Sequence, residues 1–378
     1  MAERAGERRP RVLMLVDALY DGTGGAERFA VGLATALPAD RFEVGLCATR
    51  TADGYLVRSL ERSGVHHFAL ERKGRFDVLP FVRLARLLRR QRIDVLHCHK
   101  FGSNVWGTII GRACRVPVVL AHEHTWSYEG QPVRRLLDGR LIARLADRFV
   151  AVSNEDRRRM IEIEGVPHAK AIMIPTGYVP REDGSVGQLK AELGLPADAA
   201  VIGTVAQLRP QKALTVMIDA LALLPEPGVQ LVLVGDGPSR EELEAHAATV
   251  GVSDRVHFLG TRVDLGTIFA GLDVAAMSSD FEGLPLFAFE CMAHGTPLVA
   301  TRVGGLPDQI EDGVTGLLVP RRDPQALATA LGELLGDPAR RDRMAAAAEE
   351  RLGRFTMEVI AERFAELYDF LLRAHRAR

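Results

Sequence analysis

The carboxylates best placed to do chemistry lie in one segment of the sequence. Glu282 and Glu290 belong to SSDFEGLPLFAFECMAHGTPLVATRVGG, which spans residues 278–305. An apolar, strand-like run over 274–277 precedes this segment, and Pro285 occupies the place where a proline opens a helix. Glu290 follows Glu282 by about two turns of helix, so we expect both carboxylates to face the same side.

The start of this predicted helix, which runs from Pro285 to His294, is a candidate anion site. Its first backbone N–H groups have no partner within the helix, and the helix dipole adds positive charge there. A phosphate group suits that environment. Because two carboxylates would repel a diphosphate unless they accept hydrogen bonds from sugar hydroxyls, we expect a ligand that carries both phosphate and many hydroxyl groups.

The alternative for this segment is an ordinary helix with two solvated glutamates. The neighbours of Glu290 disfavour that interpretation, because Ala288, Phe289, Cys291 and Met292 are all apolar. A carboxylate in such surroundings is rarely buried without a partner.

Pairs of glycines and histidines are further candidates. Gly24 and Gly25 in GTGGAER either let the backbone approach a ligand or simply form a tight turn before a helix. His97 and His99 alternate at the end of a predicted strand, where metal binding is the functional alternative. No third ligand stands at a suitable spacing in the sequence, so we expect no metal site.

The apolar pattern predicts the scaffold that must position these residues. Strand-sized runs rich in Val, Ile and Leu alternate with helix-length amphipathic segments, and the pattern restarts in the second half of the chain. Such alternation is typical of parallel sheets covered by helices on both faces. The expected fold class is α/β with two doubly wound domains, whose ligands bind outside the carboxyl ends of the strands in a shared cleft.

The predicted elements are as follows. The strands are 12–16, 44–48, 65–70, 95–98, 118–121, 149–152, 172–174, 201–205, 230–234, 256–258, 274–277, 298–300 and 316–318. The helices are 26–37, 78–92, 102–114, 133–146, 214–224, 240–249, 286–293 and 325–335, with one more over about 355–372.

Composition sets the class of protein. The chain has 378 residues, of which 47% are hydrophobic and 26% charged. This excludes a disordered, collagen-like or small disulfide-rich protein. No apolar run approaches the ~20 residues of a membrane span, and the polar start does not resemble a signal peptide. The four cysteines show no metal spacing, so we expect reduced thiols in a cytoplasmic protein, with Cys98 and Cys291 buried.

The net charge of -1 hides an asymmetry, +9 over residues 1–180 and -10 over 181–378. The basic half is expected to meet an anionic partner. Its arginines gather in 83–92 and 134–148. The helix predicted over 78–92 is either an ordinary surface helix packed on a sheet or a basic amphipathic helix in peripheral contact with the inner face of an anionic membrane. Nucleic acid is disfavoured because aromatic residues do not interleave the basic segments.

The spacing of Glu282 and Glu290 resembles the signature of glycosyltransferase family 4, whose members are retaining nucleotide-sugar enzymes of the GT-B fold. Other segments resemble motifs of this family in the same order along the chain, from about Arg11 onward. They are GTGGAER (22–28), AHEHTW (121–126), AVSN (151–154), IPTGY (174–178), VAQLRPQKA (205–213), LVLVGDGP (231–238), VHFLGTR (256–262) and GVTGLLVP (313–320).

The resemblance implies two Rossmann-like domains that face a central cleft. Residues 1–178 would bind the acceptor and 190–354 the nucleotide-sugar, with a linker over 179–189. The last segment, 355–378, would be a helix that crosses back to the N-terminal domain.

The resemblance also implies a role for each residue that matches a family motif. His124 would lie beside the donor sugar at the reacting centre, and Lys212 would neutralise the leaving diphosphate, so that neither metal nor cofactor is needed. Glu282 would hold the donor sugar and Glu290 the nucleotide ribose. The remaining implied donor-binding residues are Gly24, Gly25, Gln207, Arg209, Arg262, Gly283, Leu284, Pro285 and Leu286.

Three positions depart from the family pattern. Gln207 stands where the family usually has arginine, so the diphosphate loses one cation unless Arg209 compensates. Thr176 replaces an asparagine, and Ala213 replaces a glycine. His122 is the alternative to His124 as the active-site histidine.

The expected activity is transfer of a hexosyl group from a nucleoside diphosphate sugar, UDP-linked by family frequency, to an acceptor hydroxyl with the anomeric configuration retained. The acceptor would be a cell-surface glycan, a glycolipid or a small metabolite. The sequence contains no Asp-x-Asp, the pattern of the other large, metal-dependent glycosyltransferase fold. A sugar-nucleotide epimerase on the same fold and a non-catalytic sugar-nucleotide-binding protein are the alternatives.

Overall fold

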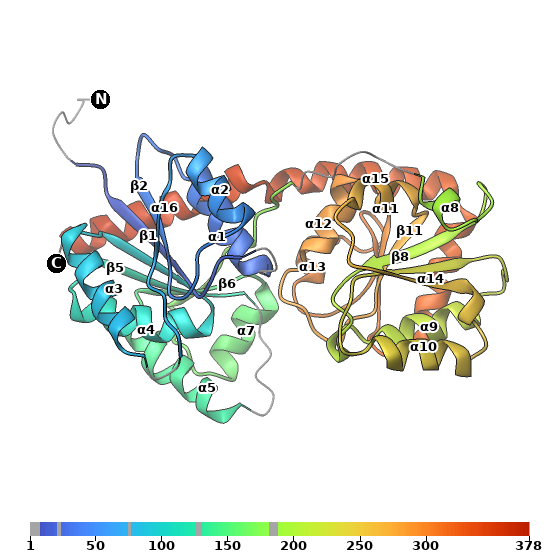
Figure 1. The fold of residues 1–378 in the computed structure, drawn as a ribbon, viewed down its shortest axis with the longest axis horizontal. Coiled ribbons are helices and arrows are strands. Elements are labelled where there is room, and N and C mark those ends of the chain that lie inside the picture. The colour runs from blue at the N-terminus through green and yellow to red at the C-terminus, as the bar shows by residue number, and fades with distance from the viewer. Residues whose placement is uncertain (1–7, 21–23, 75–76, 125–130, 181–187, 378) are drawn as a thin grey trace. The chain divides into compact units, whose positions relative to one another are not determined.

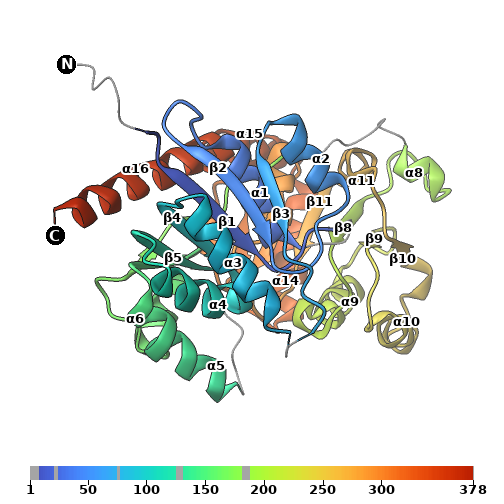
Figure 2. The ribbon, with the colours of Figure 1, turned by 60° about the vertical axis from the view of Figure 1, so that its left-hand side comes forward.

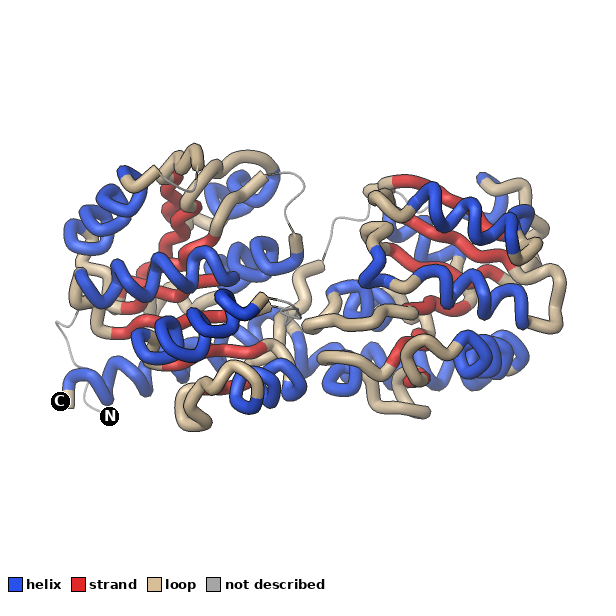
Figure 3. The backbone as a smooth tube through the Cα atoms, turned by 90° about the horizontal axis from the view of Figure 1, so that it is seen from below, coloured by secondary structure: helices blue, strands red, loops and turns tan. Residues whose placement is uncertain are grey.

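Two parallel sheets, each lying between layers of helices, form the described part of the chain in a computed structural model (Figure 3). The structure describes residues 8–20, 24–74, 77–124, 131–180 and 188–377. The first unit comprises Met1–Val179 together with Phe355–Arg378, and the second comprises Pro180–Arg354 (Figure 1). Most of the predicted linker, residues 181–187, lies outside the described residues.

The first unit contains a seven-stranded sheet in the order β3-β2-β1-β4-β5-β6-β7. Its strands are β1 (Arg11–Val16), β2 (Glu43–Ala48), β3 (His66–Ala69), β4 (Val95–His99), β5 (Val118–Glu123), β6 (Arg148–Ala151) and β7 (Ala171–Met173). Its helices are α1 (Gly25–Ala36), α2 (Tyr55–Arg62), α3 (Leu79–Arg90), α4 (Lys100–Ala113), α5 (Pro132–Leu137), α6 (Ala143–Leu145), α7 (Asn154–Glu162) and α16 (Met357–Arg376).

Alternation along β1 divides the core of the first unit into two faces. Met14 packs into a cluster with side chains of α1, α2 and α16. Leu13 and Leu15 pack with side chains of α3 on the opposite face. Figure 2 shows α16 beside the strands of this unit, although it is the last helix of the chain.

The second unit contains a six-stranded sheet in the order β10-β9-β8-β11-β12-β13. Its strands are β8 (Val201–Val205), β9 (Gln230–Val234), β10 (Val256–Gly260), β11 (Val274–Met277), β12 (Leu298–Thr301) and β13 (Leu317–Val319). Its helices are α8 (Leu189–Glu192), α9 (Leu214–Leu223), α10 (Arg240–Thr249), α11 (Leu265–Gly271), α12 (Leu286–Ala293), α13 (Leu306–Gln309), α14 (Pro324–Gly336) and α15 (Pro338–Leu352). Side chains of α9, α10 and α14 cover one face of the sheet, and those of α8, α11 and α12 cover the other.

The predicted strands are all present, with ends shifted by one or two residues, whereas some helices differ. The helix predicted over 133–146 is confirmed as a continuous helical segment, with a π-helical turn (Asp138–Ile142) between α5 and α6 that was not predicted. The helices α2, α7, α8, α11, α13 and α15 were not predicted. In α7 only Asp156 and Met160 are buried, so its sequence carries little apolar periodicity.

Three of the four cysteines are buried, including the predicted Cys98 and Cys291, and none of the four forms a disulfide. No described helix has the length and hydropathy of a membrane span.

Candidate donor and histidine sites

The loops with the predicted donor-binding residues meet at one edge of the second sheet. The strand order reverses between β8 and β11, because β9 lies on one side of β8 and β11 on the other. Lys212 follows β8 and Glu282 follows β11. In open parallel sheets, ligands bind at the carboxyl ends of the strands at such a reversal.

Two glycines bring the loops of this edge into backbone contact. Gly235 has a φ of 126°, and a Cβ at this position would lie 1.9 Å from the carbonyl oxygen of Ala206. Gly304 has a φ of 54°, and a Cβ there would lie 1.8 Å from the carbonyl oxygen of Glu282. Neither position has room for a side chain, so these glycines set how closely the loops approach one another.

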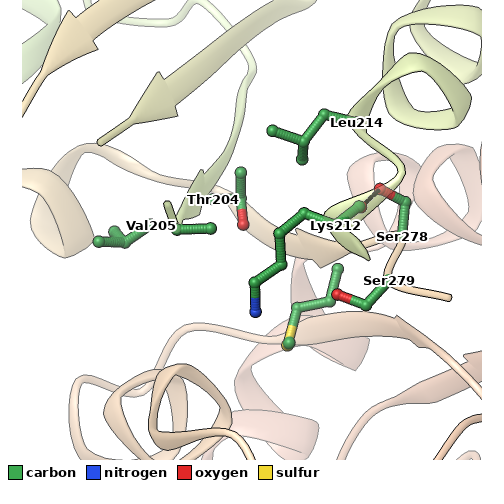
Figure 4. A pocket seen from close by; sticks show the side chains of 8 residues that line it. Thr204, Val205, Lys212, Leu214, Ser278 and Ser279 are labelled. Carbon is green, nitrogen blue, oxygen red and sulfur yellow. Dashed lines mark hydrogen bonds between the residues drawn. The ribbon is translucent and has the colours of Figure 1, made fainter. Parts of the chain in front are cut away.

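Lys212 and Glu282 form an ion pair in this structure. Lys212 Nζ donates to Glu282 Oε1 across 2.6 Å, and the Ser279 hydroxyl donates to the same oxygen across 2.6 Å. The Ser278 hydroxyl donates to the carbonyl oxygen of Lys212 across 2.9 Å, which ties the loop after β8 to the loop after β11 (Figure 4). A cation and a carboxylate therefore stand side by side at the reversal point.

Helix α12 begins directly after this pair. The helix spans Leu286–Ala293, as in the predicted element, and Pro285 is its N-cap rather than its first residue. Glu290 is 4% exposed in the middle of the helix, which excludes the interpretation of a solvated glutamate. The residues between Glu282 and the helix, Gly283 and Leu284, are buried, as is Phe287 in its first turn.

The arginines near this edge have different surroundings. Gln207 and Arg209 are both exposed, and Arg209 lines a cavity with Asp280 and Arg322 rather than the small cavity that Lys212 lines. Arg262 donates to Asp264 across 2.7 Å, and its guanidinium lowers the pKa of that carboxyl to about 2. Because its side chain is held in this way, the backbone is the part of Arg262 left for a ligand.

Four histidines gather on one face of the first sheet. His97 and His99 alternate along β4, and His122 on β5 and the adjoining His124 lie beside them. His97 Nε2 lies 3.2 Å from His122 Nδ1, and His99 Nδ1 lies 3.0 Å from His124 Nε2. Tyr368 of α16 contacts His97 Nδ1 across 2.7 Å.

Burial keeps these imidazoles neutral. His97, His99 and His122 are fully buried, and His124 is half-buried. Burial lowers the pKa of His99 to about 3. It also lowers the pKa values of His97, His122 and His124 well below 6.5, and the neighbouring histidines, with Lys100 beside His124, add to this effect.

The expectation that no third ligand lies near His97 and His99 is wrong. His122 brings a nitrogen to within 4.8 Å of theirs, because β5 pairs with β4. A spacing search along one strand misses a residue on its neighbour. Both HCH in β4 and HEH at the end of β5 have the period of two that puts histidines on one face, and this signal would have revealed the cluster.

The glycine pair lies at the start of α1. Gly24 is its N-cap and Gly25 its first residue, while Gly22 and Thr23 of the same motif lie outside the described residues. A Cβ at Gly24 would meet Glu27 Oε2 at 3.6 Å, an ordinary contact. Of the described atoms, therefore, none requires glycine at this position. Thr125 and Trp126, which follow His124, also lie outside the described residues.

Sequence reasoning missed a charged pair beside the histidines. Lys100 Nζ lies 2.7 Å from Glu27 Oε1, and Glu27 is 4% exposed. Lys100 has a φ of 69° where β4 passes into α4. The strand pattern predicts where β4 ends, but not that its next residue pairs with α1.

Comparisons with known proteins agree with this architecture. Residues 23–182 match the family described as Glycosyltransferase Family 4, and residues 186–351 match Glycosyl transferases group 1. The D-inositol 3-phosphate glycosyltransferase of Nocardia farcinica is 34% identical over 304 residues, which cover 74% of this chain and 67% of that protein. The chain belongs to glycosyltransferase family 4.

Two further matches cover a larger share of this glycosyltransferase. The D-inositol 3-phosphate glycosyltransferase of Corynebacterium glutamicum is 29% identical over 360 residues, 85% of each chain. The crystal structure of Anabaena HepE in complex with UDP has a TM-score of 0.80 and 26% identity, and it covers 95% of this chain and 99% of HepE. These matches identify the fold as GT-B and the protein as an enzyme.

Proposed function

We propose that this family 4 enzyme transfers a hexosyl group from a UDP-sugar to an acceptor hydroxyl, with retention of configuration and without a metal ion. The observation that carries the proposal is the pair of Lys212 and Glu282, 2.6 Å apart where the strand order reverses. It offers a cation to a leaving diphosphate and a carboxylate to sugar hydroxyls. Anabaena HepE was solved with UDP-glucose, which supports this nucleotide-sugar as the first donor to test.

The transfer exchanges one bond for another at the anomeric carbon. The bond from this carbon to the diphosphate oxygen breaks, and the acceptor oxygen bonds to the carbon from the same face. The acceptor's hydroxyl proton goes to the leaving diphosphate. Lys212 and the N-terminus of α12 stabilise the negative charge that develops on the diphosphate. Glu282, which already accepts from Lys212 and Ser279, orients the sugar rather than attacking it.

The acceptor is proposed from the relatives. Those named above are D-inositol 3-phosphate glycosyltransferases, so this compound is the first acceptor to test. Glycolipids and cell-surface glycans form the second group of acceptors.

The test is donor turnover with UDP-, GDP- and ADP-sugars in the presence of EDTA. We expect slow release of UDP from one UDP-sugar alone and faster release with the acceptor. Proton NMR of the product should show the anomeric configuration of the donor. An inverted product, or turnover abolished by EDTA and restored by a divalent cation, would contradict the proposal. An epimerised donor would identify an epimerase, and a bound donor that stays intact would identify a binding protein.

Lys212→Ala tests the role of the cation. We expect kcat to fall about 10²–10³-fold, the usual cost of removing a group that stabilises transition-state charge. Lys190→Ala is the matched control, because Lys190 pairs with Asp273 across 3.2 Å at the opposite end of β11. Turnover near the wild-type rate in Lys212→Ala would exclude this mechanism.

We also propose peripheral contact between the first unit and an anionic membrane. Helix α5 has no buried residue, and it exposes 70% of Val133 and 51% of Leu136 beside Arg135. Helix α3 packs Leu84 and Leu88 into the core, as an ordinary surface helix does, and only its first residues remain exposed and apolar. Exposed apolar side chains next to arginines suit the surface of an anionic bilayer.

Sedimentation with vesicles of anionic lipid tests this contact. We expect binding at low salt that is weaker at high salt and weaker in the double variant Val133→Asp, Leu136→Asp. Absence of binding at low salt would end the proposal.

A further inference from the structure

His124 belongs to a row of hydrogen-bonded side chains that starts at a methionine. His99 Nε2 lies 3.5 Å from Met14 Sδ, and His99 Nδ1 lies 3.0 Å from His124 Nε2. Met14 stands on β1 and is fully buried. The three side chains therefore link the middle of the sheet to the half-buried end of β5.

The chemistry of the thioether decides where the proton of His99 lies. A methionine sulfur accepts a hydrogen bond but has no proton to donate. A hydrogen bond across this contact therefore places the proton on His99 Nε2. Burial lowers the pKa of His99 to about 3, so the ring is neutral and carries a single N–H. His99 Nδ1 is then a bare acceptor.

The same argument applies to the ring of His124. Since His99 Nδ1 accepts, His124 Nε2 must donate, and burial keeps His124 neutral as well. The single proton of His124 therefore lies on Nε2, and its Nδ1 carries a lone pair. Within the described residues, no side chain or backbone group makes a hydrogen bond to this Nδ1.

We propose that Met14 and His99 are positioning residues that hold His124 in its Nε2–H tautomer, so that Nδ1 accepts a hydrogen bond from a hydroxyl group of the sugar or of the acceptor. The tautomer follows from these contacts together with the neutral state of the buried rings, and the substrate contact rests on the proposed function. In this tautomer His124 Nδ1 accepts a hydrogen bond from a hydroxyl group and cannot donate one to an oxygen. The presence of a histidine at this position does not by itself decide between these two roles.

Packing around this row of side chains holds the rings in place. The edge of Phe29 contacts His124 at a centroid distance of 5.5 Å and His99 at 6.1 Å. The ring of His122 stacks on His124 with centroids 4.2 Å apart, and the tilted ring of His97 packs against His99 at 4.3 Å. With these neighbours and an aromatic cover, neither His99 nor His124 can rotate without disturbing the core.

The test is two-bond proton–nitrogen NMR on the whole protein labelled with ¹⁵N-histidine, without substrate. We expect a protonated Nε2 and an unprotonated Nδ1 for His124, with the signal assigned by its loss in His124→Asn. A proton on Nδ1 of His124 would overturn the proposal. So would a stoichiometric metal ion, found by elemental analysis of the purified protein, whose removal shifts the His99 signals.

Met14→Leu tests whether the methionine sulfur fixes the tautomer of His99. Leucine fills a similar volume but accepts no hydrogen bond, so His99 is free to adopt either tautomer. We expect mixed tautomers for His124 and a fall in kcat of roughly tenfold, less than the ~10²–10⁴ for losing a proton-transfer group, with the donor KM unchanged. Met160→Leu is the control, because Met160 is equally buried in this unit but packs in another cluster.

The outcomes separate the two proposals. An Nε2–H tautomer of His124 without turnover of any nucleotide-sugar would contradict the proposed function but not the positioning role of Met14 and His99. Turnover with an Nδ1–H tautomer would contradict that positioning role. So would a Met14→Leu variant that keeps both the wild-type tautomer and the wild-type kcat. If Met14→Leu fails to fold, the tautomer of the wild-type protein still decides.

Discussion

Gln207 stands where the family pattern has an arginine, beside the proposed donor loop. Its side chain is exposed, and its carbonyl oxygen accepts from the backbone N–H of Arg209 across 2.9 Å. The loop that holds it continues to Lys212. A longer side chain at this position therefore has room to extend without disturbing the core.

Gln207→Arg is expected to tighten donor binding. A hydrogen bond to a charged group contributes about 1.5 kcal/mol, so the KM for the donor should fall roughly tenfold at low salt. Initial rates over a range of donor concentrations measure this, with Arg209→Gln as the companion variant. If KM rises in Arg209→Gln and stays unchanged in Gln207→Arg, Arg209 already supplies the missing cation.

At the scale of loops and helices, glycine backbones determine how closely the loops of the proposed donor site approach one another. Gly304 and Gly313 both have positive φ, 54° and 81°, and both lie in loops of the second unit. They differ in their surroundings. A Cβ at Gly304 would collide with the carbonyl oxygen of Glu282, whereas a Cβ at Gly313 would meet nothing within 4 Å.

Gly304→Ala is expected to displace Glu282 and lower kcat/KM for the donor by about 100-fold, as losses of active-site positioning do. Gly313→Ala should only cost about 1 kcal/mol of stability from backbone strain, with normal kinetics. Steady-state kinetics and thermal unfolding of both variants test this pair. Equal kinetic effects would show that strain, rather than the position of Glu282, causes the loss.

The π-helical turn between α5 and α6 contains a buried carboxyl group. Asp138 is fully buried at the start of this turn, and among the described residues neither of its oxygens has a hydrogen-bond partner. Burial raises its pKa to about 8, with further contributions from Glu164 and Glu123. Folded protein therefore holds a proton on Asp138 at neutral pH, while unfolded protein does not.

Asp138→Asn is expected to stabilise the protein at high pH. Between about pH 4 and pH 8 the folded state binds the extra proton, so this group makes the wild type less stable as pH rises. The variant lacks this loss and should be more stable by on the order of 5 kcal/mol at pH 8, with a difference that vanishes near pH 4. Urea unfolding at several pH values measures the difference. A constant difference across pH would mean that Asp138 titrates normally.

At the scale of the whole molecule, the end of the chain completes the first unit. Phe355–Arg378 belongs to the same unit as Met1–Val179. Helix α16 buries eight residues, and Phe364 among them contacts Phe29, His97 and His122. Helix α16 therefore supplies part of the packing around the histidines.

Phe364→Ala is expected to destabilise the first unit by about 3–5 kcal/mol, the usual cost of removing a buried phenylalanine. Phe370 is the control, because it lies on the same helix and is 53% exposed, so Phe370→Ala should change stability by less than ~0.5 kcal/mol. In calorimetry, Phe364→Ala should lower the unfolding temperature of one unit and leave that of the other unchanged. Phe370→Ala should change neither. Equal shifts in the two variants would contradict this role of α16.

The local pattern of the sequence was sufficient to predict every strand, the two doubly wound sheets and the family. Strand-sized apolar runs are a property of neighbouring residues, and parallel sheets at such spacing leave few alternatives. The period of two in HCH and HEH also lay in the sequence. The π-helix at Asp138 did not, because it depends on how Gly139 packs against the backbone of Glu164, where a Cβ would lie 1.8 Å from the carbonyl oxygen.

Only the tertiary structure decided which side chains meet. Lys212 and Glu282 are 70 residues apart and pair because β8 and β11 are neighbours in the sheet. Met14, His99 and His124 come from three segments, and their order in space follows from β1, β4 and β5 lying side by side. Strand order and register are set by the packing of the whole sheet. For this reason the tautomer of His124 depends on a methionine far from it in sequence.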